Sequence, residues 1–446
     1  MSKITQVIKR SGAIVPFNPG RISNAIYRAA VSVGGRDKER AEWLTEQVVA
    51  LLEQHGSQGH IPHIEEIQDI VEGVLIENGH AQVAKEYILY REKRALTRQG
   101  SASDTTQHTG NIPWSKIWRA LDWAIEHNLH TVEALNARIS AGEFGAIVQE
   151  SEAAYEEEVR QAAKKIAERG AELKMVIISG PSSSGKTTTT TKLEQHLKQT
   201  GLKFVPLNVD HYFYNLEMHP QDEFGDYDFE TPQALDLELI DDHLQRLMRG
   251  EQVSIPFYDF KTSQRSMDQT PMQLQEDEIL LIDSLHGLFP KMTSGISDEA
   301  KFKVYLEPLL QMRASDGKYI RWADLRLMRR MLRDAAHRAY DPQKTLLHWH
   351  YVRASELRYI IPYIGTTDVI INSSMPYEVS LYRPLLLERF AEWEVKYKED
   401  PLRHDAHERA LRLHKLLQDV EAVEDDSAVP SDSVLREFIG GSSLEY

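Results

Sequence analysis

The stretch ISGPSSSGKTTTTTKLEQHL, residues 178–197, decides the fold of the second half of this chain. It begins inside a short apolar run, Met175 to Ser179, which is typical of a buried parallel strand. Gly180 and Gly185 permit backbone angles that a side chain would forbid, so the N–H groups between them can point toward one anion. A helix is predicted from about Lys186, and its N-terminus adds a positive dipole. Strand, glycine loop and helix together predict a phosphate-binding loop.

The side chains of this loop suit ATP with its magnesium ion. Lys186 is expected to reach the β- and γ-phosphates, and the Thr187 hydroxyl is expected to ligate Mg²⁺. The alternative is a glycine- and serine-rich turn that matches by chance, but the flanking strand and helix favour phosphate binding. The expected cofactors are therefore ATP and Mg²⁺, and the candidate contacts are Gly180, Ser182, Ser183, Ser184, Gly185, Lys186, Thr187 and Thr188.

The composition limits the class of protein. A chain of 446 residues is expected to hold two or three domains. It contains no cysteine, which excludes disulfides and cysteine-ligated zinc. The net charge of −16 argues against nucleic acid as a partner. No run approaches the roughly 20 apolar residues of a membrane span, and the polar N-terminus lacks a signal-peptide pattern. We therefore expect a cytoplasmic protein without a membrane partner.

Changes in sequence pattern divide the chain into four segments. Residues 1–96 predict a small α-rich domain with two short strands at its start. Residues 97–170 predict a polar linker followed by a helical segment. Residues 171–400 alternate strand and helix, which predicts an α/β domain with a mainly parallel sheet and flanking helices. Residues 401–446 predict a helix, an acidic loop and a docking tail.

The helical segment carries an apolar stripe that we interpret as a packing surface. It consists of Trp114, Ile117, Trp118, Leu121 and Ile125, whose spacing places them on one helical face.

The N-terminal segment resembles an ATP-cone, the regulatory nucleotide-binding domain best known in ribonucleotide reductases. The resemblance rests on VIKRSGAIVPFNPGRISNAI (7–26) and EEIQDIVEGVLIENGHAQVAKEYILYR (65–91). A Lys-Arg pair beside a glycine turn can clamp a triphosphate, although a solvated basic hairpin is the alternative reading of that pair. The resemblance implies that ATP or dATP binds here, at Val7, Lys9, Arg10, Arg21 and Ile22.

Five later motifs, in order along the chain, resemble the uridine kinase and phosphoribulokinase family of P-loop kinases. After the phosphate-binding loop come PLNVDHYFYN (206–215), GDYDFETPQALD (225–236), IPFYDFKTSQR (255–265), EILLIDSLHGL (278–288) and DLRLMRRMLRDAAHR (324–338). The ending SVLREFIGGSS (433–443) also resembles bacterial members of the family that are nucleoside kinases, in which other N-terminal domains precede the kinase. The resemblance implies phosphoryl transfer from ATP to a small-molecule alcohol.

Two carboxylates match the catalytic positions of this family. Asp210 ends a predicted strand and matches the catalytic base that takes the proton of the acceptor hydroxyl. A helix cap is the structural alternative for such a residue. Asp283 ends the apolar run ILLI and would hold Mg²⁺ directly or through water. Relatives often carry Glu at this place, and the shorter Asp leaves direct contact with the metal open.

Four arginines match the lid helix of the family. Arg326 and Arg329 are predicted to be catalytic, and Arg330 and Arg333 to bind the ATP phosphates. Arginine suits bidentate phosphate contacts, and three of the four can share a helical face. A solvated helix with salt bridges to Asp324 and Asp334 is the alternative.

The acceptor site departs from the family pattern. Glu230 stands where uridine kinases carry an acidic residue that grips ribose hydroxyls, with Asp228 close by. Tyr258 matches an aromatic residue that contacts the base, but Ser263 replaces the family's base-reading histidine. A site that loses such a hydrogen-bonding group should change its specificity. The predicted acceptor is therefore a nucleoside of the uridine or cytidine kind, with another nucleoside or a sugar-like alcohol left open.

Three functions remain open from the sequence. The first is a nucleoside kinase regulated at the ATP-cone. The second is a phosphoribulokinase-like sugar-phosphate kinase, and the third is a nucleotide-sensing regulatory protein with an inactive kinase domain. Both families commonly assemble, so the resemblance implies a homo-oligomer.

Overall fold

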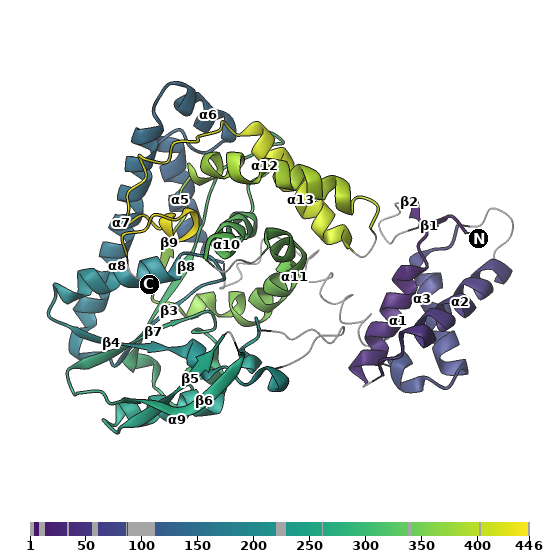
Figure 1. Ribbon diagram of the computed structural model, residues 1–446, viewed down its shortest axis with the longest axis horizontal. Coiled ribbons are helices and arrows are strands. Elements are labelled where there is room, and N and C mark those ends of the chain that lie inside the picture. The colour runs from purple at the N-terminus through teal and green to yellow at the C-terminus, as the bar shows by residue number, and fades with distance from the viewer. Residues whose placement is uncertain are drawn as a thin grey trace. The chain divides into compact units, whose positions relative to one another are not determined.

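A computed structural model describes residues 4–8, 14–33, 35–55, 61–85, 87, 112–219, 229–260, 262–337, 341–400 and 403–444. These residues form two compact units, one within residues 1–108 and the other within residues 109–446 (Figure 1). Among the described residues, none of the helices combines the length and the apolar character needed to cross a membrane.

The N-terminal unit is a small helical domain with one β-hairpin. Strands β1 (Gln6–Ile8) and β2 (Ile14–Pro16) pair antiparallel. Helices α1 (Gly20–Ser32), α2 (Lys38–His55) and α3 (Ile64–Glu77) follow and bury their apolar faces in one core. Two short strands followed by helices agree with the pattern predicted for this segment.

The second unit is built around a five-stranded parallel sheet. Its strand order is β4-β7-β3-β8-β9, which confirms the predicted α/β class. The strands are β3 (Met175–Ser179), β4 (Lys203–Asn208), β7 (Glu278–Ser284), β8 (Lys301–Glu307) and β9 (Val369–Asn372). Strands β5 (Val253–Asp259) and β6 (Gln264–Met272) form a separate antiparallel hairpin.

Helices cover both faces of the sheet (Figure 1). Alternate residues of β3 point to opposite sides. Val176 and Ile178 join the larger core, and Met175 and Ile177 join a smaller core with α9 and β5. The helices of this unit are α5 (Trp114–Glu126), α6 (Val132–Ser140), α7 (Phe144–Arg169), α8 (Lys186–Lys198), α9 (Leu237–Met248), α10 (Trp322–His337), α11 (Pro342–Tyr359), α12 (Glu378–Tyr397), α13 (His404–Asp419) and α14 (Arg436–Ile439).

The helical segment before the sheet is part of the same core. Helix α7 contributes Tyr155 and Ile166 to the larger core, and the Glu158 carboxylate accepts a hydrogen bond from the Asn372 backbone at 2.6 Å. Within the described residues the α5 stripe is only partly packed, with Ile117 and Leu121 half-buried. Trp114, Trp118 and Ile125 are 51%, 67% and 50% exposed, because the side of α5 turned inward carries Trp123 and Ala124.

Candidate active site

The phosphate-binding loop lies between the carboxyl end of β3 and the start of α8, and two of its positions require glycine. A β-carbon on Gly180 would lie 2.2 Å from the Leu306 carbonyl oxygen, closer than any contact allows. Gly185 has a φ of +93°, in the left-handed region that side chains disfavour. The predicted glycine roles therefore have a direct steric cause.

The polar groups of the loop fit a phosphate chain. The hydroxyls of Ser183 and Ser184 are buried and make no hydrogen bond with the described residues. The Lys186 ammonium donates to the carbonyls of Gly180 and Pro181 at 3.0 and 3.3 Å, which holds it inside the loop. Burial lowers the pKa of Lys186, and the nearby carboxylate of Asp283 partly opposes this. Unpaired hydroxyls beside a lysine and a helix N-terminus make a site that an anion would complete.

Two carboxylates meet beside this loop. Asp283 on β7 pairs in register with Ile178 of β3 on one side and with Asn208 of β4 on the other. Burial raises the pKa of Asp283 to about 6, with Lys186 opposing the rise and Asp210 adding to it. Asp210 follows β4 on an exposed turn, where its backbone N–H donates to the Asn208 side chain at 2.9 Å. The carboxylate predicted as base and the one predicted for the metal are therefore close enough to affect one lysine.

The fit of Mg²⁺ depends on ATP. Among the described residues no cluster of three or more metal-ligating His, Asp or Glu side chains occurs. Thr187 is exposed at the first turn of α8, and Asp283 is the last but one residue of β7, beside the loop. A hydroxyl and a single carboxylate suit a magnesium ion that takes its remaining ligands from phosphate oxygens and water. Thr187 and Asp283 are the residues that would hold it.

Two of the four arginines of α10, Arg330 and Arg333, are partly exposed. The Arg330 guanidinium donates to the Ser182 hydroxyl at 3.2 Å and to Glu230 at 2.7 Å. Arg333 is partly exposed, and its guanidinium donates to Asp334 at 3.3 Å. Both side chains keep some exposure, as a phosphate-binding role requires.

The other two arginines of α10 are completely buried in ion pairs. Arg326 makes two hydrogen bonds to Glu356, at 2.5 and 3.0 Å, and also donates to the Ser182 carbonyl at 3.2 Å. Arg329 makes a two-bond pair with Glu378, at 2.7 and 2.9 Å. Their burial favours a positioning role over the predicted catalytic one. The reason is that α10 packs on both sides, so its arginines cannot all face one cleft.

The acceptor residues are placed unequally. Glu230 is buried beside Arg330; burial acts to raise its pKa, but Arg330 outweighs this and the net pKa is lowered. Tyr258 is buried against the rings of Phe213 and Phe260, so little of it is open to a base. Ser263 lies at the β5–β6 turn with a φ of +55°. Asp228 lies outside the described residues.

The sequence reasoning missed two residues near the loop. Glu437 of α14 accepts hydrogen bonds from Thr188, and His286 lies buried after β7 near Glu230 and Lys186. Both belong to motifs noted in the sequence, LREFIGG and DSLHGL, but neither motif shows on its own that its residue reaches the loop.

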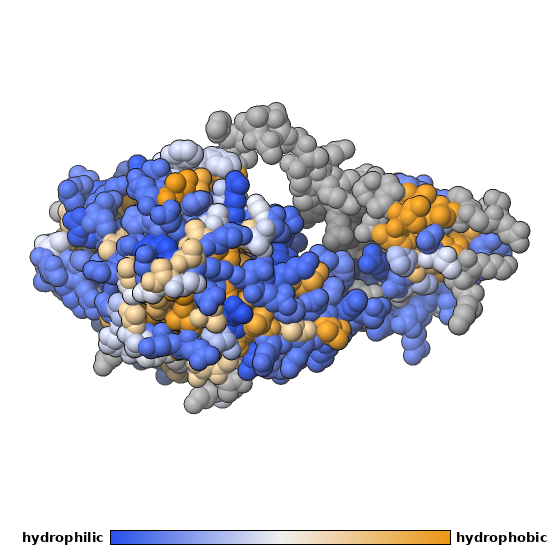
Figure 2. All heavy atoms as spheres, turned by 90° about the horizontal axis from the view of Figure 1, so that it is seen from above, coloured by the Kyte–Doolittle hydropathy of each residue, from blue (hydrophilic) through white to orange (hydrophobic). Residues whose placement is uncertain are grey.

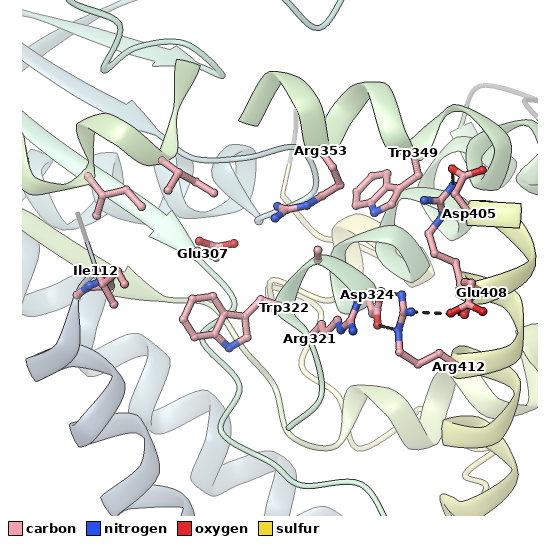
Figure 3. Close-up of a pocket in the computed structure, with 15 residues that line it drawn as sticks. Ile112, Glu307, Arg321, Trp322, Asp324, Trp349, Arg353, Asp405, Glu408 and Arg412 are labelled. Atoms are coloured by element: carbon pink, nitrogen blue, oxygen red, sulfur yellow. Dashed lines mark hydrogen bonds and ion pairs between the residues drawn. The ribbon is translucent and has the colours of Figure 1, made fainter. Parts of the chain in front are cut away.

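A cavity of about 590 Å³ lies among α5, α10, α11 and α13 (Figure 3). Trp322 comes from the start of α10, Trp349 and Arg353 from α11, and Glu307 from the end of β8. Arg326 connects this cavity to the phosphate-binding loop, because its Nε lies 3.4 Å from Glu307 and its Nη1 bonds to Ser182.

The predicted regulatory site is only partly described. Val7 and Ile22 are buried in the core of the N-terminal unit, and Arg21 is exposed at the start of α1. Lys9 and Arg10 lie outside the described residues, so the triphosphate clamp stays a prediction. Figure 2 shows a patch of hydrophobic side chains on the visible face of this unit, and Ile14, Val33, Trp43 and Ile76 are among its exposed large hydrophobic residues.

Comparison with known proteins agrees with both halves of the chain. Residues 5–96 match the ATP cone domain family, and residues 175–380 match the Phosphoribulokinase / Uridine kinase family. Uridine kinase from Bacillus mycoides is 30% identical over 195 residues, which cover 44% of this chain and 82% of that enzyme. Uridine kinase from Oceanobacillus iheyensis is 28% identical over 44% of this chain and 83% of its own length.

The N-terminal match is to part of a larger protein. The vitamin B12-dependent ribonucleoside-diphosphate reductase of Thermoplasma acidophilum is 44% identical over 101 residues, 22% of this chain. The match spans only 13% of the reductase's length.

The parallel sheet, the glycine loop and the acidic residues beside it define a P-loop kinase. The chain belongs to the phosphoribulokinase and uridine kinase family, and it carries an ATP-cone domain at its N-terminus.

Proposed function

We propose that this protein is an ATP-dependent nucleoside kinase that phosphorylates the 5′-hydroxyl of a uridine- or cytidine-like nucleoside. One observation carries the proposal. Glu230, expected to bind ribose hydroxyls, is held by Arg330, and the same guanidinium nitrogen bonds to Ser182 of the phosphate-binding loop. The candidate acceptor residue and the phosphate-binding loop are thereby linked through one side chain.

Each residue of the site has a distinct part in this reaction. Asp210 accepts the proton of the attacking hydroxyl. Lys186, Arg330 and Arg333 stabilise the charge that develops on the transferred phosphoryl group. Thr187 and Asp283 would hold Mg²⁺, which would neutralise charge on the phosphate chain when bound. Arg326 and Arg329 hold the loop and α10 in place from the buried side.

Regulation by ATP or dATP at the N-terminal unit is part of the proposal, because an ATP-cone precedes a domain that itself consumes ATP. We also expect a cytoplasmic homo-oligomer. The exposed Trp114, Trp118 and Ile125 of α5 support an assembly, since large apolar side chains clustered on one helix face often mark a contact surface.

The proposal is tested by measuring ADP release from Mg-ATP in the presence of each member of a panel of nucleosides, sugars and sugar phosphates. The expected result is turnover with one or more ribonucleosides, and none with the Lys186→Ala variant. Turnover with a sugar phosphate alone would instead indicate a phosphoribulokinase-like activity. Absence of turnover with every acceptor, while ATP still binds, would indicate a nucleotide-sensing protein.

A further inference from the structure

His286 occupies a tight turn directly after β7, pressed against the neighbouring strand. Its backbone N–H donates to the Ser284 hydroxyl at 3.3 Å, and its carbonyl accepts from Phe289 at 2.8 Å. The next residue is Gly287, where a β-carbon would lie 2.6 Å from the Ile177 side chain. The backbone of the turn is therefore fixed close to β3, and His286 has little room to move.

The imidazole of His286 is buried without a hydrogen bond of normal geometry. Its side chain is 3% exposed, neither ring nitrogen makes a hydrogen bond of normal geometry with the described residues, and the Glu230 backbone is the polar group that approaches the ring. Among the described residues its ring contacts the edge of Tyr359, with centroids 6.2 Å apart at 89°. A buried polar group with no partner is costly, and native proteins keep few of them. Packing alone therefore does not explain why this residue is a histidine.

The charged groups near His286 indicate a role for its ring nitrogens. The carboxylate of Glu230 and the ammonium of Lys186 are both close enough to influence its protonation. Burial lowers the pKa of His286 to about 4, although Glu230 acts to raise it. A neutral imidazole presents one N–H donor and one acceptor nitrogen. Glu230, held ionised by Arg330, presents acceptors only.

We propose that His286, together with Glu230, binds the phosphate acceptor through a pair of its hydroxyl groups. One hydroxyl accepts from the imidazole N–H, and the other donates to the second ring nitrogen or to Glu230. This inference rests on the proposed function and narrows its substrate class. Neither His286 nor Glu230 carries a positive charge, and Arg330 is paired with Glu230, so these two side chains suit the vicinal diol of a ribonucleoside.

The test compares wild type with His286→Phe, which keeps an aromatic ring against Tyr359 but removes both nitrogens. Acceptors are uridine and cytidine, each with its 2′-deoxy and 3′-deoxy forms. Wild type should prefer the ribonucleosides by at least tenfold in kcat/KM. The variant should raise the KM of the ribonucleoside about tenfold or more, leave the KM of ATP within twofold, and lose the preference for the diol. His286→Asn should restore part of that preference, because its amide again supplies a donor and an acceptor.

Two outcomes would overturn the inference. One is equal kcat/KM of wild type for ribonucleosides and deoxynucleosides. The other is a His286→Phe variant in which the KM values of ATP and acceptor rise equally while the melting temperature falls. A core role predicts that second pattern. If wild type phosphorylates a sugar and no nucleoside, the proposed function fails, but a rise in the KM of that sugar in His286→Phe still supports the inference.

Discussion

The carboxylate of Glu437 accepts hydrogen bonds from both the backbone N–H and the hydroxyl of Thr188, at 3.3 and 3.0 Å. Thr188 lies in the first turn of α8, where the helix dipole favours an anion and where a phosphate is expected. The same tail places Val434 against Gly185 and the ring of Phe438 5.1 Å from the Arg329 guanidinium. The C-terminal segment thus puts a carboxylate at a position that the ATP phosphates would use.

Replacing Glu437 by Gln should therefore strengthen ATP binding. The amide keeps the size of the side chain but removes the charge that competes with phosphate. A charge at a helix N-terminus is worth about 0.3–1 kcal/mol, which corresponds to roughly a 2- to 5-fold lower Kd for ATP. Calorimetry with Mg-ATP measures this Kd. The control is Glu424→Gln, which lies on an exposed part of the same tail. Weaker binding in Glu437→Gln would show instead that this residue supports the loop.

Asp210→Asn should separate binding from chemistry. The amide occupies the same space but cannot accept the proton of the acceptor hydroxyl, and the loss of a general base typically lowers turnover by about 10²–10⁴-fold. ATP affinity should stay near that of wild type, because Asp210 follows β4 and is no part of the phosphate-binding loop. Turnover within a factor of about ten of wild type would assign Asp210 a structural role in its turn.

The local features of the site could be predicted from the sequence. The strand at Met175–Ser179, the glycine loop and the helix from Lys186 depend on neighbouring residues, and all three occur as expected. The mainly parallel sheet also agrees with the alternating strand and helix pattern of residues 171–400. Gly180 and Gly185 lie where the backbone requires them.

The burial of individual side chains could not be predicted, because it depends on distant partners. Arg326 pairs with Glu356, thirty residues further on, and the partner of Thr188 lies 249 residues away. The spacing of the arginines puts them on one helix but cannot show that α10 is covered on two sides. The exposure of Trp118 on α5 could not be predicted for the same reason, because it depends on whether distant residues cover this face, and none of the described residues does.

Loss of Arg326 should mainly lower stability, whereas loss of Arg333 should mainly lower turnover. Arg326→Met removes one of the two arginines that pair with the buried Glu356 and leaves Arg353 as the other, so stability should fall by at most the about 3–5 kcal/mol typical of breaking a buried pair. Arg333→Met should cost little stability, since its side chain is partly exposed, but should reduce turnover. Urea unfolding and ADP release measure the two effects. An Arg326→Met variant that is as stable as wild type but inactive would restore the catalytic assignment.

His286 should make the protein sensitive to mild acid. Its pKa is about 4 in the fold, below the usual value of 6.5, so the unfolded chain binds the extra proton first. Stability from this residue is complete above pH 6.5 and is lost as the pH falls toward 4, by roughly 3 kcal/mol in all. His286→Phe should lose less stability than wild type between pH 6.5 and 4, as measured by urea unfolding at each pH. Parallel curves for the two proteins would contradict the low pKa.

The last prediction concerns coupling between the ATP-cone and the kinase. Two nucleotide sites on one chain suggest that one senses what the other consumes. Coupling free energies between such sites are typically about 1–3 kcal/mol, or roughly 5- to 150-fold in affinity. ATP or dATP beyond the catalytic requirement should therefore change the kinase activity, and inhibition by an end-product nucleotide is the simplest direction.

Changing both Lys9 and Arg10 to Ala should remove this response and keep the basal activity, since neither residue belongs to the kinase domain. Lys38→Ala, at the start of α2, is a matched control that keeps the response. Deleting residues 1–96 should have the same effect as the double variant. Identical titration curves for wild type, double variant and truncated protein would show that the ATP-cone does not regulate this kinase.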